Sequence, residues 1–365
     1  MKIYKISLCL IFALFATTLD AQQKKNDGFV LNGHLDGIEN NVVVYLVDID
    51  GQKTIEYAKI FNGTFRLKGK VGEPTACWLQ CKDKYTNLMV ENTEMTYSSS
   101  YENMQLYAKV KGGREQQLQN ELIALQLPYE KLYLEASDSL RNDLYADKKT
   151  KEALIKKNND NGEASQRIYI KFGKENYNSF LGLDIIYRNR ETIGKDSIKM
   201  LYDKLNSDLK KTVKAEALKV FSTEILAQVG EYFIDFEAKT INGDTFKLSS
   251  LKGKYIFLSF GSAGCVPCRW ENKQISKNYE KFKDKIYFVS FSIDKNREAW
   301  LEVSKKDNIT WTNVSDLKGE GSKTKNLYNV QAIPTSFLID KNGIIIEKFD
   351  GYNDDFLNKI ENKLN

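Results

Sequence analysis

Two cysteines separated by two residues are the part of this sequence best suited to chemistry. Cys265 and Cys268 lie between the apolar run 255–260 and a charged stretch that begins at Arg269. We expect the run to form a buried strand and the charged stretch to form a helix that opens at the cysteines. Unpaired backbone N–H groups and the positive end of the helix dipole favour a thiolate there. The pattern predicts a dithiol redox site in which Cys265 reacts first.

Such a pair also has two structural interpretations, a zinc half-site or unrelated core cysteines. Zinc needs four ligands, and besides this pair the chain has only His34, Cys9, Cys77 and Cys81. A zinc site would have to join Cys77 and Cys81 to a pair far along the chain, which is the less favoured interpretation. On a strand these two cysteines share one face about 13 Å apart, too far to bond. We expect Cys77 and Cys81 to act as small buried hydrophobic residues, unless a bend in the strand lets them form a disulfide.

The single histidine restricts the classes of enzyme that the chain could be. Ser-His-Asp and Cys-His catalysis would require His34 to serve a nucleophile elsewhere in the sequence. Its neighbours resemble a strand with outward polar positions, so we expect an ordinary surface residue. The sequence also contains no Gly-rich phosphate loop of Walker or Rossmann spacing.

Length and composition are those of a globular protein with more than one domain. The chain has 365 residues, of which 42% are hydrophobic and 28% charged, enough for two or three domains. Its 54 Lys and Arg and 49 Asp and Glu give a formal charge of +5 and are interspersed along the chain. The charge is diffuse, so we expect no nucleic-acid partner.

The first residues fit a secretory signal peptide, which we place at 1–21. Lysines precede the apolar stretch 6–19, and a polar start follows near Gln22. Ala21 suits the position before a cut, but Leu19 is larger than usual there, so the cleavage position stays open. The stretch is short for a membrane span, so no span should remain after cleavage. We expect the mature chain in the periplasm or cell envelope, where disulfides persist.

The segment 22–112 shows short β-prone runs separated by turns, which predicts a small antiparallel sandwich or barrel. The pair Asn62-Gly63 lies between two such runs and predicts a hairpin. The segment has no convergent catalytic residues, so we expect it to act as a scaffold or to bind a partner.

The segment 113–228 has helical periodicity and is predicted to be a helical connector. The apolar positions are Leu118, Leu122 and Leu125 before Pro128, Leu132, Ala136, Leu140 and Leu144 on a second helix after it, and later Ile198, Leu201, Leu205 and Leu209. The lysine- and asparagine-rich run 148–163 suggests an exposed connection or a frayed helix end. The apolar stripes could support a homodimer, although packing within the chain is the simpler arrangement.

The segment 229–365 alternates strand-like and helix-like runs, which predicts an α/β domain with a mixed sheet flanked by helices. The turn Lys341-Asn342-Gly343 should make a hairpin of its last two strands.

This last segment resembles the TlpA/ResA-like thiol-disulfide oxidoreductases of the thioredoxin superfamily. The matching motifs, in order, are Gly230, Asp235-Phe236, 248–254, Cys265-Val266-Pro267-Cys268-Arg269 with Glu271, Ser292-Ile293-Asp294, 330–335 and 338–343. The two upstream segments also look like the β domain and helical connector of many secreted members. The resemblance implies a thioredoxin-like fold, protein disulfides as substrates, an upstream thiol electron donor, and no metal or cofactor beyond the Cys265–Cys268 disulfide.

The resemblance also implies roles for individual residues. Cys265 would be the exposed attacking thiolate, and the more buried Cys268 would resolve the mixed disulfide. Glu271 would sit by the dithiol, where a carboxylate opposes thiolate formation and could relay protons. From the sequence alone, the favoured interpretation of Glu271 would be a solvated helix carboxylate paired with Lys273 or Lys277.

Substrate contacts are implied at two places around the dithiol. Ile333-Pro334 matches the cis-proline loop that faces it, where the residue before proline can pair with an extended substrate strand. Gly264, Val266 and Pro267 would line the rim that substrates meet.

Three departures from the family pattern put substrate choice and reduction potential in doubt. Gly264 replaces a common tryptophan, Lys273 a proline after the second cysteine, and Ile234 a proline before Asp-Phe.

We interpret the chain as a reductase of particular protein disulfides, because Glu271 would oppose the effect of the helix dipole. Two alternatives are a peroxiredoxin-related thiol peroxidase and a non-catalytic cell-envelope binding protein. The peroxidase spacing expects a proline and a threonine where this chain has Leu258 and Ser262, which disfavours it.

Overall fold

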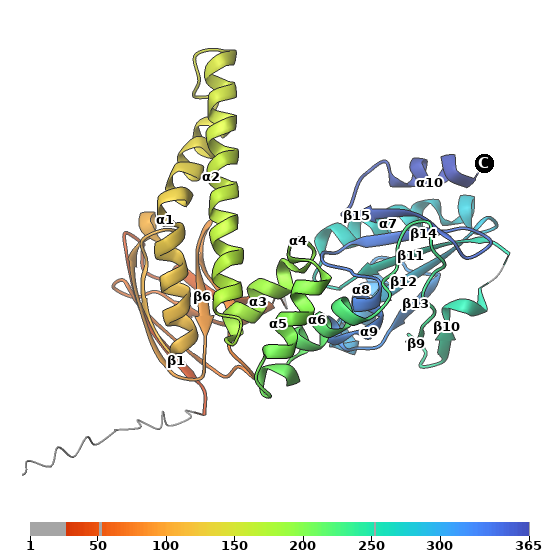
Figure 1. The fold of residues 1–365 in the computed structure, drawn as a ribbon, viewed down its shortest axis with the longest axis horizontal. Coiled ribbons are helices and arrows are strands. Elements are labelled where there is room, and N and C mark those ends of the chain that lie inside the picture. The colour runs from red at the N-terminus through yellow and green to blue at the C-terminus, as the bar shows by residue number, and fades with distance from the viewer. Residues whose placement is uncertain (1–26, 51–52, 252, 365) are drawn as a thin grey trace, which may run out of the picture.

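The computed structural model describes residues 27–50, 53–251 and 253–364. The predicted signal peptide and Cys9 lie outside them. Figure 1 shows a β domain with two long helices on the left, shorter helices in the middle and an α/β domain on the right. The predicted multi-domain architecture is therefore confirmed, while the limits 22–112, 113–228 and 229–365 stay predictions.

The N-terminal domain is a sandwich of two four-stranded sheets, ordered β4-β1-β7-β8 and β3-β2-β5-β6. Its strands are β1 (Phe29–Asp36), β2 (Val43–Asp48), β3 (Lys53–Lys59), β4 (Thr64–Gly69), β5 (Thr75–Cys81), β6 (Lys84–Val90), β7 (Glu94–Ser100) and β8 (Lys109–Lys111). Alternate residues such as Leu31 and Leu79 are fully buried between the sheets. One pair departs from the predicted antiparallel pattern, because β1 and β7 run parallel. The chain enters β7 from the other sheet, so no hairpin forces it to reverse.

The turn at Asn62-Gly63 forms, but the predicted hairpin is wrong. Both residues have positive φ, 49° and 72°, and Phe61 and Thr64 exchange two backbone hydrogen bonds of 2.9 Å across the turn. Beyond that bridge β3 pairs with β2, whereas β4 pairs with β1 in the other sheet. Phe65 of β4 is buried in the core that the two sheets share.

The cysteines of β5 are core residues, as predicted. Cys77 and Cys81 are free and fully buried on its inward face. Burial raises the pKa of both thiols, which keeps them protonated. His34 is a surface residue, with its ring Nε2 2.8 Å from Oδ1 of Asp36.

The helical segment begins with two long helices, α1 (Arg114–Arg141) and α2 (Lys148–Glu175), which stand out from the body of the molecule in Figure 1. Pro128 lies inside α1 and does not end it, contrary to prediction. Contacts with α2 on both sides of the proline hold the helix together: Gln126 Nε2 lies 2.8 Å from Ser165 Oγ, and Asn158 Nδ2 donates to Tyr133 O at 3.1 Å.

Only part of the predicted apolar stripe is buried along α1. Leu122 and Ala136 are each 1% exposed, whereas Leu125, Leu132 and the following Leu144 are 53%, 37% and 64% exposed. The predicted homodimer through these helices stays a prediction.

The run 148–163 is regular helix within α2, not the expected connection or frayed end. Asp147 caps it by accepting a 2.7 Å hydrogen bond from the Thr150 backbone N–H. Lys148 forms an ion pair with Glu152, and Lys156 forms one with Asp160. Both pairs have i,i+4 spacing, which suits an exposed helix.

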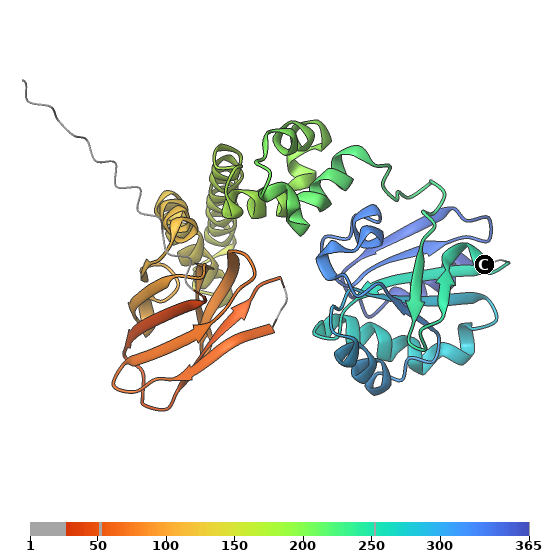
Figure 2. The same cartoon turned by 90° about the horizontal axis from the view of Figure 1, so that it is seen from below.

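A charged cluster joins the β domain to the shorter helices α3 (Phe180–Arg188), α4 (Arg190–Ile193), α5 (Lys195–Lys204) and α6 (Val213–Thr223). Lys214 of α6 contacts Asp184 of α3 and lies 2.7 Å from Asp50, which follows β2. Arg188 also contacts both carboxylates. Figure 2 shows these helices between the two larger domains.

The C-terminal domain has a seven-stranded sheet of order β10-β9-β13-β12-β11-β14-β15. Its elements are β9 (Glu237–Thr240), β10 (Thr245–Lys247), β11 (Tyr255–Gly261), α7 (Val266–Phe282), β12 (Ile286–Ser292), α8 (Arg297–Lys306), β13 (Thr312–Ser315), α9 (Lys323–Leu327), β14 (Thr335–Ile339), β15 (Ile345–Asp350) and α10 (Phe356–Leu364). Strands β11, β12 and β13 are parallel and the other pairs antiparallel. The predicted mixed sheet and final hairpin are confirmed. The strands β9, β10 and β13 were not predicted, because they are too short to show a clear periodicity in the sequence.

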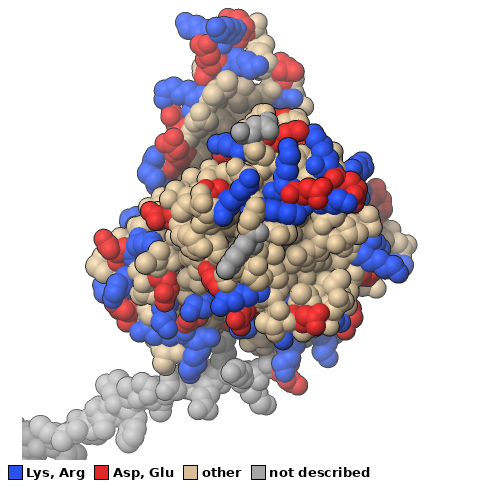
Figure 3. All heavy atoms as spheres, turned by 90° about the vertical axis from the view of Figure 1, so that its right-hand side faces the viewer, with Lys and Arg blue, Asp and Glu red and all other residues tan. Residues whose placement is uncertain are grey.

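Helices α7 and α10 cover one face of this sheet, where Ile275 and Ile360 pack around Phe257. Phe260 and Tyr328 belong to the core of the other face. On the side of the molecule seen in Figure 3, lysine and arginine are interspersed with acidic residues, in agreement with the diffuse charge expected from the sequence.

A second joint connects the helical segment to this domain. Lys325 of α9 is buried and lies 2.7 Å from Glu320, which also accepts a 2.6 Å hydrogen bond from the Tyr187 hydroxyl of α3. The Ala227 backbone N–H donates to Leu327 O at 2.9 Å.

We expect Lys214→Ala to lower the free energy of unfolding by about 3 kcal/mol, because Asp50 and Asp184 would then share a buried site with Arg188 alone. Urea unfolding followed by circular dichroism would measure it. Lys211→Ala, at a side chain that is 75% exposed, is the control and should leave the transition in place. Equal midpoints for Lys214→Ala and wild type would show that the cluster does not stabilise the joint.

Candidate active site

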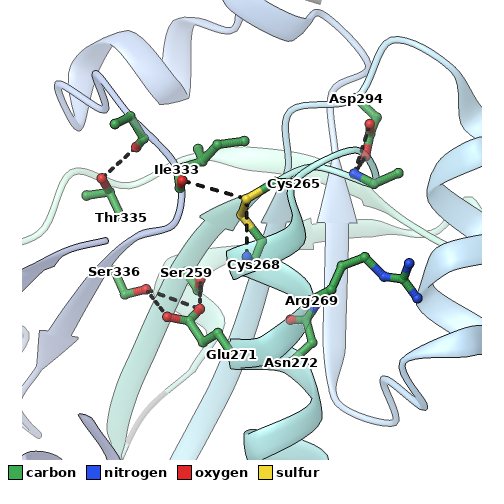
Figure 4. The surroundings of a disulfide bond; sticks show 12 residues. Ser259, Cys265, Cys268, Arg269, Glu271, Asn272, Asp294, Ile333, Thr335 and Ser336 are labelled. Atoms are coloured by element: carbon green, nitrogen blue, oxygen red, sulfur yellow. Dashed lines mark hydrogen bonds between the residues drawn. A yellow bond between two sulfur atoms is a disulfide. The ribbon is translucent and has the colours of Figure 1, made fainter. Parts of the chain in front are cut away.

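The two cysteines of the motif lie where β11 passes into α7. Cys265 is the N-cap of the helix and Cys268 lies in its first turn, and the two are joined by a disulfide (Figure 4). Pro267 occupies the first turn, where a missing backbone N–H costs no helical hydrogen bond. The helix therefore begins at the position that the sequence predicts.

A backbone hydrogen bond distinguishes the two sulfurs. The Cys268 N–H donates to Sγ of Cys265 at 3.1 Å, so on reduction the same N–H and the helix dipole would stabilise a thiolate on Cys265. The expected difference in exposure is wrong, because Cys265 is 3% and Cys268 4% exposed. The loop at Ile333 approaches the first sulfur and shields it from solvent.

The loop before β14 faces the disulfide, as Figure 4 shows. The Ile333-Pro334 peptide bond is cis, and Ile333 O lies 3.6 Å from Sγ of Cys265. The hydroxyl of Thr335 donates to Ala332 O at 2.7 Å, which fastens the loop to the strand. The structure thus brings together two segments that lie far apart in the sequence.

Glu271 lies one turn into α7 and points inward below the disulfide (Figure 4). It is 3% exposed and accepts hydrogen bonds from the hydroxyls of Ser259 on β11 and Ser336 on β14, the latter at 3.2 Å from Oε2. Burial raises its pKa to about 7, against the opposing effect of these two hydrogen bonds. The alternative of a solvated carboxylate paired with lysine is therefore wrong. Its serine partners were not predicted, because they come from two other strands.

Asp294 is a further residue of the site that the sequence analysis left without a role. Its Oδ2 accepts hydrogen bonds from the Ala263 N–H at 2.9 Å and from the Ser292 hydroxyl at 2.7 Å. Burial raises the pKa of this carboxyl as well. The contact with Ala263 fixes the loop that leads from β11 to Cys265.

A small cavity of about 40 Å³ adjoins the second cysteine. Cys268, Asn272 and Asp294 are among its lining residues. Apolar side chains such as Phe291 and Trp300 line it as well.

Arg269 anchors the first turn of α7 away from the dithiol. Its guanidinium makes two hydrogen bonds to Oδ1 of Asp307, at 2.9 and 3.1 Å, and the Asp307 side chain is fully buried at the end of α8. In Figure 4 this arginine points away from the sulfurs. Its contacts with Asp307 position the first turn of the helix.

The three residues next to the cysteines that were predicted to contact substrates differ in their exposure. Gly264 is exposed, Val266 is 55% exposed and Pro267 is partly buried. Their contact with substrates stays a prediction. In the described ranges no three His, Cys, Asp or Glu side chains form a group that could hold a metal ion, and none of the described helices is long and apolar enough to cross a membrane.

Comparison with known proteins gives the family. Residues 229–348 match the profile described as the AhpC/TSA family, and residues 29–119 match a domain of unknown function, DUF4369. Thiol-disulfide oxidoreductase ResA of a Bacillus cereus strain is 31% identical over 132 residues, which are 36% of this chain and 75% of that protein. This chain belongs to the ResA-like thiol-disulfide oxidoreductases.

Other relatives fall in the same part of the chain. Thioredoxin-like protein YneN of Bacillus subtilis is 30% identical over 33% of this chain and 71% of that protein. The solved thioredoxin domain of a thiol-disulfide oxidoreductase from Bacteroides vulgatus is 28% identical, with a TM-score of 0.36 over 38% of this chain and 99% of that one. The ResA relatives are named thiol-disulfide oxidoreductases. This favours thiol-disulfide exchange over the two alternative functions, a thiol peroxidase and a non-catalytic binding protein.

The pKa of Glu271 in this ResA-like domain predicts a pH-dependent stability. The folded pKa of about 7 lies above the ordinary 4.5, so between these values the folded protein keeps a proton that the unfolded chain releases. The free energy of unfolding should therefore fall as pH rises through this window, by about 3 kcal/mol from this group. Glu271→Gln should remove this component and be more stable than wild type at pH 8.

Urea unfolding of the oxidised protein at several pH values would measure the effect, with buried Trp300 and Trp311 as fluorescent reporters. Glu302→Gln, at a surface carboxylate paired with Lys306, serves as the control. An identical pH slope in wild type and Glu271→Gln would show that the buried carboxyl is not its source.

Proposed function

We propose that this protein is an extracytoplasmic reductase of protein disulfides. The observation that carries the proposal is the arrangement at Cys265: its sulfur is bonded to Cys268, accepts the Cys268 N–H at 3.1 Å and lies 3.6 Å from Ile333 O of the cis-proline loop. This arrangement can hold a nucleophilic sulfur, a resolving sulfur and an extended substrate backbone in one place.

The reaction begins from the reduced dithiol. The Cys265 thiolate attacks one sulfur of the substrate disulfide, a bond to that sulfur forms, and the other substrate sulfur leaves as a thiolate. Cys268 loses its proton and attacks Cys265, which forms the intramolecular disulfide and releases the second substrate thiolate. The substrate has then gained two electrons, and the thiolates take up protons from solvent or from the site.

Glu271 supports the reductive direction. A buried carboxyl with a pKa of about 7 can accept the proton of Cys268 near neutral pH. Once charged, it disfavours a thiolate in the reduced dithiol and so favours the disulfide form of the protein. A protein whose own disulfide is favoured is a donor of electrons to other disulfides.

Location and partners follow from the same chemistry. The signal-like pattern of residues 1–21 supports export, and in an oxidising compartment the protein must receive electrons after each turnover. The donor is a second dithiol protein, which would reduce Cys265–Cys268 by the reverse exchange.

Substitution of the two cysteines separates their roles. Cys265→Ser should abolish insulin-disulfide reduction, whereas Cys268→Ser should accumulate mixed disulfides that mass spectrometry can identify, because no sulfur remains to release the substrate. Cys81→Ala is the control, since this thiol is buried in the β domain. Full insulin reduction by Cys265→Ser would refute the proposed mechanism.

Export predicts a processed N-terminus. When the full chain is produced in a bacterial host, the periplasmic fraction should contain a protein that begins near Gln22, as measured by intact mass. A chain lacking residues 1–21 should stay in the cytoplasmic fraction. Recovery of the full chain, uncut and only in the cytoplasmic fraction, would contradict the assigned location.

A further inference from the structure

An exposed apolar strip begins beside the disulfide and covers about the first turn of α7. Val266 is 55% and Trp270 51% exposed, and their i,i+4 spacing places them on one helical face. Large apolar side chains exposed next to a reactive group indicate a contact surface more often than scattered ones do. We call Val266, Trp270 and Tyr352 the aromatic rim.

Tyr352 connects the helix side of the rim to the cis-proline loop. Its ring lies 5.8 Å from the ring of Trp270. The preceding residue, Gly351, donates its backbone N–H to Pro334 O at 2.8 Å. The rim is thus continuous with the two segments that hold the disulfide.

The support beneath Trp270 is rigid. The Tyr352 hydroxyl bonds to Asp354 at 2.5 Å and accepts from Gln274 at 2.7 Å, and its ring packs 6.3 Å from buried Phe356. Both ends of the tyrosine are held before any ligand arrives, so little ordering of the rim opposes binding.

The rim is short and one-sided. The exposed face of α7 continues from Trp270 to Lys273 and Lys277, so the apolar strip ends after about one turn. On the other side of Cys265, Gly264 carries no side chain, and nothing lies within 4 Å of the place where a Cβ would be. A substrate therefore meets one apolar contact site beside the sulfur.

We propose that the aromatic rim selects substrate disulfides that carry a large apolar side chain close to the cysteine. From Cys265 to Trp270 the helix rises about 7.5 Å, which an extended substrate at about 3.3 Å per residue spans in about two residues. The selected side chain therefore lies two positions from the attacked cysteine. The inference rests on the proposed function, since it identifies the substrates of the same dithiol.

The test compares two peptide disulfides in reactions with the reduced full chain. The peptides are disulfide-linked homodimers, identical except that the residues two positions from cysteine are Phe in one and Ser in the other. Second-order rate constants for single-turnover reduction are measured by chromatography of the released peptide thiol. A ratio of two rate constants on one protein cancels any change in the dithiol itself.

We expect wild type to reduce the Phe peptide about tenfold faster than the Ser peptide, as expected for partial burial of one large side chain. Trp270→Ala should bring the ratio near one, and Trp270→Phe should restore most of it. Trp78→Ala is the matched control, because this tryptophan is 37% exposed on β5 of the β domain, and it should keep the wild-type ratio.

Two results would overturn the inference and leave the proposed function intact: equal rate constants for both peptides in wild type, or an unchanged ratio in Trp270→Ala. Failure of reduced wild type to react with either peptide would overturn the proposed function and the rim together.

Discussion

The start of helix α7 at Cys265 is the constraint on which the chemistry depends. A helix that begins there directs the Cys268 N–H toward the first sulfur, at 3.1 Å, and brings both cysteines within bonding distance. Pro267 in the first turn, the anchored Ala263 and the Arg269–Asp307 pair all keep the start in place.

Two acidic groups lie on either side of this helix start, Glu271 buried and Asp294 partly buried. Glu271 lies beneath the second cysteine between two serines, whereas Asp294 holds the preceding loop beside a small cavity. Each is paired only with hydroxyl or backbone donors in the described structure, so burial raises both pKa values. A carboxyl that titrates near neutrality can exchange protons where a surface glutamate would stay charged.

The remaining two-thirds of the chain is connected to this domain through joints that contain both charged groups and apolar contacts. Lys214 and Arg188 join the β domain to the helices, and the Tyr187 hydroxyl of α3 joins the helices to the C-terminal domain by donating to Glu320. Charged groups at such joints fix one geometry, because each ion must keep its partner when it leaves water. The β domain itself shows a packed sandwich core, as expected of a scaffold or partner-binding unit.

The sequence by itself determined the redox pair, the helix that opens at it and the α/β order of the C-terminal third, because these depend on local spacing and periodicity. Helix α1 passing through Pro128, and the strands on either side of Asn62-Gly63 entering different sheets, were decided only by packing. The burial of Glu271 between strands β11 and β14, and the contact of Trp270 with Tyr352, are likewise tertiary. These features join residues that are distant in sequence. A local sequence pattern does not indicate which distant side chains will pack against a given residue and remove it from water.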